Sequence, residues 1–342
     1  MDLQAAFDLV TERLARIDFS ALWPGFRPLK FALYDGERCY FDGAFVPKTA
    51  EFMANTSIEY RGEQIAVWQL EGEPDPDRLA ASLAHEMFHA FQTISGESRW
   101  ADERSALLTY RYTPENLSLK LREAELMRRA LEQSSRAAYG DLLALRKRRA
   151  MDFPAEYDYE ARIEQIEGTA SLVELEALGQ LDPSKGRAGW EKLLERMEDP
   201  ANYTPVRAVS YDLGAAFLAC IRRFGAYDVH PFTDTPFALG VLAGVEPAAG
   251  DFPPDPRMGE QVRAYREETE RIVRAALEKG EVALEGPLPL ASLNVFDARW
   301  NGKYAVSTHF IAWWEDGKMK SLEGDFVAEL DRDFILRRVY RQ

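Results

Sequence analysis

The residues whose spacing best fits a known chemistry are His85, Glu86 and His89, in the run HEMFH. Residues four apart lie on one face of an α-helix, so both imidazoles can reach the same metal ion. Neutral imidazole nitrogen is a preferred ligand of Zn²⁺. Glu86 follows His85 with a rotation of about 100° around the helix axis. Its carboxylate would lie beside the ion and could accept a proton from bound water.

The context of this HExxH run strengthens the interpretation. The chain has only 4 histidines, and two of them belong to the run. The surrounding segment LAASLAHEMFHAFQTI contains no Pro or Gly and predicts a continuous helix over about 76–95. The alternative is a pair of hydrogen-bonded core histidines, which would be costly to bury side by side.

A catalytic zinc site takes three protein ligands and leaves one position open for water. The other two histidines, His230 and His309, are candidates by residue type, and Glu167 is the better candidate. Gly168 follows Glu167, and because glycine weakens a helix its presence suggests close packing. Gly168 and Ala170 together would let the helix that carries Glu167 approach the motif helix. The alternative is that Glu167 belongs to an ordinary solvated helix face. Four carboxylates lie near one face of this helix at helical spacing: Glu160, Glu164, Glu167 and Glu174.

Three segments in this order resemble the gluzincin metallopeptidases, and among them the zinc aminopeptidase and leukotriene-hydrolase family. They are the HExxH run, the segment EGTASLVE that begins at Glu167, and the segment SYDLGAA at 210–216. The resemblance implies that His85, His89 and Glu167 bind one zinc ion and that Glu86 is the general base.

The resemblance also implies two supporting roles. Tyr211 would donate a hydrogen bond to the oxyanion of the tetrahedral intermediate. Glu174 would orient a zinc-bound histidine from behind. For both residues the simpler alternative stays open, namely a core tyrosine with a satisfied hydroxyl and an ordinary surface glutamate.

The chain departs from that family in two ways. The stretch from His89 to Glu167 is longer, which indicates a helical insertion at about 115–160. No segment resembles the one that holds a substrate's free amino group, so aminopeptidase specificity is not implied. The strand expected at Ile65–Leu70 could line the cleft and pair with an extended substrate.

The elements around the motif indicate an α+β fold. We expect a zincin-like catalytic domain at 1–283, with a mixed N-terminal β-sheet within 26–70 and a helical half that carries the metal site. A small β-rich appendage would follow at 284–342, with a hairpin turn at Asp316-Gly317. Periodicity and capping signals predict the helices, in order, at about 2–17, 76–95, 115–150, 157–179, 187–197, 207–224 and 258–279. A Pro- and Gly-rich loop is expected at 229–257, and the charge run RKRR at 146–149 is interpreted as a solvated helix end.

Composition limits the classes of partner. The 342 residues carry a formal net charge of -15, which disfavours nucleic acid and anionic membrane surfaces as partners. No stretch reaches the length of a membrane-spanning segment, which is about 18 uninterrupted apolar residues, and the N-terminal residues do not resemble a signal peptide. We therefore expect a cytoplasmic protein in which Cys39 and Cys220 are buried free thiols.

These observations together predict a zinc-dependent hydrolase, specifically a metallopeptidase that acts on a peptide or protein substrate. The alternative is a zinc-binding scaffold or interaction protein without turnover. The presence of Glu86 favours catalysis, because a purely structural site needs no base. The sequence does not indicate the oligomeric state.

Overall fold

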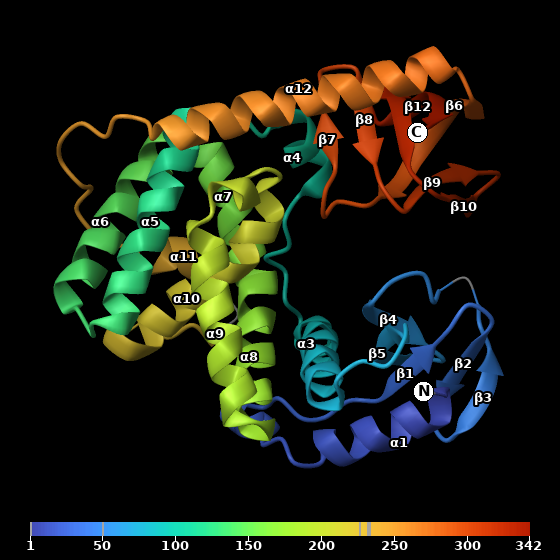
Figure 1. The fold of residues 1–342 in the computed structure, drawn as a ribbon, viewed down its shortest axis with the longest axis horizontal. Coiled ribbons are helices and arrows are strands. Elements are labelled where there is room, and N and C mark those ends of the chain that lie inside the picture. The colour runs from blue at the N-terminus through green and yellow to red at the C-terminus, as the bar shows by residue number, and fades with distance from the viewer. Residues whose placement is uncertain (1, 50, 226, 231–233) are drawn as a thin grey trace.

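The computed structural model describes residues 2–49, 51–225, 227–230 and 234–342. These residues form an α+β fold with two separate sheets, as the sequence predicts (Figure 1). The first sheet lies in the N-terminal part, the second lies in the C-terminal part, and helices occupy most of the sequence between them. The zincin-like character of this arrangement stays a prediction.

The N-terminal sheet is mixed and has the strand order β3-β2-β1-β5-β4. Strands β1 and β5 are parallel, and the other neighbours are antiparallel. The strands are β1 (Phe31–Tyr34), β2 (Arg38–Phe41), β3 (Ala44–Pro47), β4 (Thr56–Tyr60) and β5 (Glu63–Gln69).

Strand β5 cannot take the role expected for Ile65–Leu70. It lies between β1 and β4, and Ala66 has a partner on each side, Phe31 and Ser57. Both backbone edges of β5 are therefore occupied, and the expectation that this strand pairs with a substrate is wrong. The free edge on this side of the sheet belongs to β4.

Helix α3 (Pro76–Ile94) carries the HExxH run and begins where the sequence predicts. The Asp75 side chain caps the helix by accepting hydrogen bonds from the backbone N–H groups of Asp77 and Arg78, and Pro76 occupies the first turn. The helix packs against α1 (Leu3–Leu14) and β5 on one side and against α8 (Thr169–Leu181) on another (Figure 1). This enclosure explains why charged groups on α3 are buried.

The helical half contains more breaks than its sequence pattern shows. The segment expected as one helical region at 115–150 forms two helices, and 157–179 is interrupted by a π-helical turn at Glu164–Gly168. A short helix, α11 (Phe237–Gly240), lies within the expected loop 229–257, of which residues 231–233 lie outside the described residues. The remaining helices are α2 (Phe19–Leu22), α4 (Glu103–Thr109), α5 (Pro114–Glu132), α6 (Arg136–Asp152), α7 (Pro154–Ile163), α9 (Pro183–Glu198), α10 (Val206–Phe224) and α12 (Pro256–Lys279), with a 3₁₀ turn at Pro200–Tyr203.

The charge run at 146–149 is not a solvated helix end. Arg146 and Arg149 are both 0% exposed. They belong to a buried ion network in which Arg146 contacts Glu164 at 2.5 Å and Arg149 contacts Glu160 at 2.6 Å. Three cations are balanced by three carboxylates, and the members are Lys120, Glu123, Arg146, Arg149, Glu160 and Glu164. Two of the four cations of the run are therefore charge-compensated inside the helical half, while Lys147 and Arg148 stay partly exposed.

The segment 115–160 is part of the main core. Leu117, Leu121, Met127 and Leu142 belong to the same hydrophobic cluster as residues of α3, α8 and α10. Helix α3, which carries His85 and His89, nevertheless packs directly against α8, which continues from the π-turn that carries Glu167. The long stretch between them thus folds alongside this pair without separating it.

Gly168 makes its close contact with α10 and not, as expected, with the motif helix. A Cβ atom at Gly168 would lie 2.6 Å from the Cα of Gly214. A Cβ atom at Gly214 would in turn lie 2.8 Å from the Cα atoms of Glu164 and Gly168. The two backbones touch, so neither position accepts a side chain without a shift.

The C-terminal sheet is antiparallel throughout, with the order β10-β9-β6-β12-β11-β8-β7. Helix α12 extends from the helical half to this sheet and packs on it (Figure 1). The predicted hairpin joins β9 and β10, with positive φ angles at Asp316 and Gly317. The strands are β6 (Val282–Leu293), β7 (Arg299–Trp300), β8 (Tyr304–Ser307), β9 (Phe310–Glu315), β10 (Lys318–Glu323), β11 (Phe326–Leu330) and β12 (Ile335–Arg341).

The expectation that Cys39 and Cys220 are buried free thiols is confirmed. Among the described residues, no helix has the length and apolarity needed to cross a membrane.

We expect Gly168→Ala to lower the free energy of unfolding by about 1–3 kcal/mol, because the added methyl group overpacks the contact with Gly214. Urea unfolding followed by circular dichroism measures this change. The control is Gly140→Ala in α6, where nothing lies within 4 Å of the new Cβ. The Gly140→Ala variant should be about 0.5–1 kcal/mol more stable than wild type. Equal stability of the Gly168→Ala and Gly140→Ala variants would contradict the prediction.

We expect Glu160→Gln to lower the free energy of unfolding by about 3–5 kcal/mol at neutral pH, because buried Lys120 loses its carboxylate partner and Arg149 keeps only Glu123. The control is Glu132→Gln, which breaks only the exposed pair with Arg128 and should cost less than about 1 kcal/mol.

The effect of Glu160→Gln should also depend on pH. Burial opposes ionisation of Glu160, but Arg149 and Lys120 outweigh it and lower the pKa of its carboxyl to about 2. The unfolded value is about 4.3, so the carboxylate stabilises the fold above that pH and loses this contribution as the pH falls toward 2. The difference in unfolding free energy between wild type and variant should therefore shrink between about pH 5 and pH 2. A difference that does not change with pH would contradict this assignment.

Candidate metal centre

The structure brings His85, His89 and Glu167 together at one point. One donor atom from each residue lies within 4.8 Å of the others. The Nε2 atoms of His85 and His89 are 3.0 Å apart, and Glu167 Oε2 lies 3.2 Å from His89 Nε2 and 3.7 Å from His85 Nε2. All three side chains are mostly buried, with 11% to 13% exposure.

This spacing fits a small tetrahedral ion. Zinc bonds to nitrogen and carboxylate oxygen at about 2.0–2.2 Å, which places two tetrahedral ligand atoms about 3.3 Å apart. The observed separations of 3.0, 3.2 and 3.7 Å bracket that value. Two imidazoles and one carboxylate are also a known ligand set of catalytic zinc. These residues are therefore suited to hold zinc.

The second nitrogen of His89 is fixed by Gln92. His89 Nδ1 lies 2.8 Å from Gln92 Oε1, and the Gln92 amide donates to the backbone oxygen of Ile166 and to Thr169 Oγ1. Such a partner sets the tautomer and orientation of a ligating imidazole. Gln92 was not among the residues predicted for the site, although its position three residues after His89 on the same helical face was a usable signal.

The second nitrogen of His85 faces Glu174, the partner suggested by the sequence. His85 Nδ1 lies 3.2 Å from Glu174 Oε2, although the groups are not aligned as a regular hydrogen bond. Ser82 Oγ donates to the other oxygen of Glu174 at 2.8 Å. Glu174 is thus a carboxylate behind His85 and not an ordinary surface residue.

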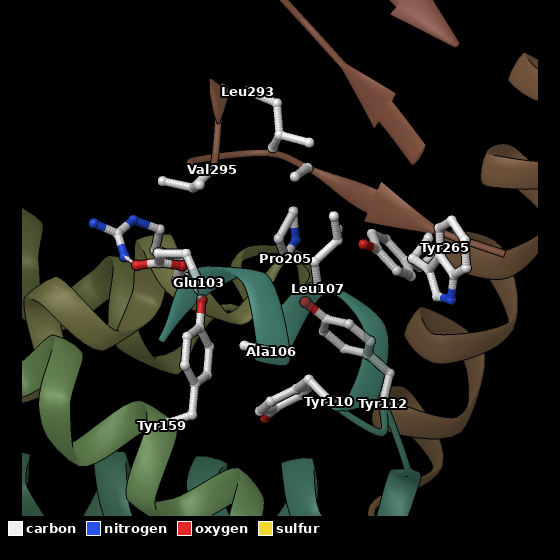
Figure 2. Close-up of a pocket in the computed structure, with 13 residues that line it drawn as sticks. Glu103, Ala106, Leu107, Tyr110, Tyr112, Tyr159, Pro205, Tyr265, Leu293 and Val295 are labelled. Carbon is white, nitrogen blue, oxygen red and sulfur yellow. Dashed lines mark hydrogen bonds and ion pairs between the residues drawn. The ribbon is translucent and has the colours of Figure 1, made fainter. Parts of the chain in front are cut away.

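Arg207 forms an ion pair with the Glu167 oxygen that points away from the histidines. It was also not among the residues predicted for the site. Arg207 donates to Glu167 Oε1 at 2.8 Å, and this leaves Oε2 facing the histidines. The same guanidinium pairs with Glu103, which accepts a 2.8 Å hydrogen bond from the Tyr159 hydroxyl. Figure 2 shows Glu103 and Tyr159 at one end of a small cavity of about 70 Å³ between α4 and the C-terminal strands. The available signal was that Arg207 precedes Tyr211 by one helical turn.

Charge in the cluster follows from these contacts. Burial lowers the pKa of His85, but Glu167 and Glu174 outweigh burial and hold this pKa well above its usual value. Burial raises the pKa of Glu167, but His89, His85 and Arg207 outweigh it and place this pKa well below its usual range. The Glu167 carboxylate is therefore ionised and favours a positive charge at the two Nε2 atoms. Either a proton or a metal cation can supply that charge.

Glu86, the residue expected to act as general base, is buried on α3 between the two histidines in sequence and feels the charges of His85, His89 and Glu167. It is 9% exposed, and no other described residue forms a hydrogen bond or ion pair with its carboxylate. Burial raises the pKa of this carboxyl. A carboxylate with a raised pKa and no partner is a stronger proton acceptor than an exposed one.

Tyr211 also belongs to the site. It lies on α10 beside Arg207, whose guanidinium carbon is 5.6 Å from the centre of the Tyr211 ring. Burial, followed by the charge of Glu167, raises the pKa of Tyr211 well above its usual value. The phenol therefore stays protonated at neutral pH and can act as a hydrogen-bond donor.

The other candidates for the third ligand lie elsewhere. His230 packs edge-on against Trp23 at 4.7 Å, and His309 is exposed near Thr308 in the C-terminal sheet. Glu164 makes two short hydrogen bonds to Arg146. Within the part of the chain that the structure describes, the metal-type cluster contains Glu167 and none of these three.

A pocket of about 650 Å³ opens beside the cluster and includes His85, Glu174 and Tyr211 in its lining. Residues of 115–160 do not contribute to that lining, so the helical segment expected as an insertion does not form a wall of the pocket. Phe296 contributes to the lining from the C-terminal part of the chain and lies edge-on to Tyr211 at 6.1 Å.

Comparison of the chain with protein-family models, with curated proteins and with solved structures finds no match. The resemblance to gluzincin metallopeptidases therefore stays a prediction from three short segments. What supports a function is the geometry of the cluster itself.

Proposed function

We propose that this protein is a zinc-dependent hydrolase, specifically a metallopeptidase with one zinc ion bound by His85, His89 and Glu167. The observation that carries the proposal is the convergence of these three donors within 4.8 Å, next to a buried Glu86 without a partner. Three protein ligands leave one position for water. The adjacent pocket of about 650 Å³ is large enough for several side chains of a peptide.

The residues divide the work of amide hydrolysis. A bound zinc ion lowers the pKa of a coordinated water and polarises a carbonyl group. Glu86 accepts the proton of the attacking water and later returns it to the leaving amine. Tyr211 donates its phenolic hydrogen bond to the oxygen that gains negative charge. Gln92, Glu174 and Arg207 hold the three ligand side chains in register.

A zinc-binding scaffold without turnover is the second candidate. The three-ligand cluster and the buried network behind it would serve that role equally well. Glu86 distinguishes the two, because a structural site gains nothing from a buried carboxylate with a raised pKa and no partner.

We expect the purified chain to bind one zinc ion, and His89→Ala and Glu167→Ala to lose it, because two remaining ligands hold zinc poorly. Inductively coupled plasma mass spectrometry after dialysis against zinc measures the content. Glu176→Ala is the matched control, since this carboxylate lies on α8, which continues directly from the π-turn that carries Glu167, and among the described residues it forms an ion pair only with Arg222. Zinc retained in Glu167→Ala would place the third ligand elsewhere.

We expect Glu86→Gln to keep its zinc but to lose about 10²–10⁴-fold in kcat for peptide hydrolysis, the range attributed to a general base. A quenched-fluorescence peptide library identifies substrates and measures the rate. If wild type hydrolyses none of the library while binding zinc, the scaffold interpretation is favoured. Equal rates for wild type and variant would exclude Glu86 as the base.

A further inference from the structure

The pocket beside the metal centre contains unpaired positive charge, although the whole chain has a net charge of -15. Its lining includes three cations and two carboxylates besides His85: Arg78, Lys192, Arg196, Glu174 and Asp212.

Both carboxylates are already engaged. Asp212 accepts two hydrogen bonds from Arg196, at 2.8 and 2.5 Å, and Glu174 faces Ser82 and His85. Lys192 contributes less than Arg196 to lowering the pKa of Asp212, and it does so through its charge and without a hydrogen bond. Among the described residues, neither Arg78 nor Lys192 forms an ion pair, so two cations face the pocket without a counter-charge.

Two different helices supply these cations to the lining. Arg78 precedes His85 by seven residues on α3, which puts both on one face, two turns or about 10 Å apart. Lys192 and Arg196 lie four apart on α9 and share a face of that helix. Between them, α8 packs against both α3 and α9 and contributes Leu175 and Leu178 to the lining.

We propose that this pocket binds an acidic side chain of a peptide substrate. The inference rests on the proposed peptidase function and specifies its substrate class. An extended peptide advances about 3.3–3.6 Å per residue, so the acidic residue would lie about three residues from the bond positioned at His85. The leucines of α8 and the exposed ring of Phe296 would contact its aliphatic stem, while Arg78 and Lys192 would neutralise its carboxylate.

The test uses peptide binding to the zinc-loaded Glu86→Gln variant, so that it does not depend on turnover. Fluorescein-labelled peptides of otherwise equal sequence carry Glu, Gln or Lys three positions from a central Ala-Phe bond, on either side of it. We expect the Glu peptide to bind about tenfold more tightly than the Gln peptide, which corresponds to about 1.4 kcal/mol.

Charge reversal should abolish the preference. Arg78→Glu and Lys192→Glu, each added to Glu86→Gln, should bind the Glu peptide no better than the Gln peptide. Glutamate at position 78 suits the first turn of α3, so folding and zinc content should be unchanged. Lys318→Glu is the matched control, because it changes net charge equally at an exposed, unpaired position on β10 of the described chain, and it should keep the preference.

The outcomes separate the two proposals. Equal binding of the Glu and Gln peptides, or a preference that survives in both reversed variants, would overturn the acidic-substrate inference even if wild type hydrolyses peptides. A preference that both reversals abolish, in a chain that binds zinc but hydrolyses none of the peptides, would support the acidic pocket and overturn the peptidase function.

Discussion

The contact between Gly168 and Gly214 is the constraint on which the position of the candidate metal centre depends. It brings the backbone of the π-helical turn against α10, within a distance that no side chain can enter. Glu167 precedes Gly168 in that turn, and Arg207 and Tyr211 lie on α10. One backbone contact therefore sets the separation between Glu167, the candidate carboxylate ligand, and the two residues of α10 beside it. A π-turn at such a place is common at functional sites, because it rotates a side chain out of the α-helical register.

The buried ion network supports this turn from the other side. Glu164, the first residue of the π-turn, makes two hydrogen bonds to Arg146. Glu160 lies one turn earlier, on α7, and pairs with Arg149 and Lys120. Buried ion pairs contribute little net stability, but they specify one arrangement, since any slip leaves a charge unpaired. The charged segment at 115–160 thus serves the site indirectly by locking the helix that carries Glu167.

The sequence predicted the parts of the site that depend on local spacing. His85, Glu86 and His89 follow from helical periodicity alone, and the start of α3 follows from Asp75 and Pro76. The α+β class and the hairpin at Asp316-Gly317 follow from alternation and turn chemistry.

The predictions that were wrong or incomplete concern residues whose environment is set by tertiary partners, and no local sequence pattern shows those partners. Arg146 and Arg149 have the composition of a solvated helix end, and only carboxylates from α5, α7 and the π-turn make their burial possible. Gly168 indicated close packing, but its partner Gly214 is distant in sequence. Strand β5 was identified, yet its place inside the sheet was not, because strand order is not encoded in the strand itself. Phe296 reaches the pocket from the far end of the chain for the same reason.

The position of Phe296 has a consequence for the order in which the site is completed during synthesis. His85, Glu167 and Tyr211 all precede residue 225, so a nascent chain that has released α10 already contains the candidate ligands and their partners. The pocket wall supplied by Phe296 arrives only after α12 and β6 have emerged, at about 5–20 residues per second. For that interval the candidate metal centre has one side of its pocket open, and the last part of the chain then covers that side.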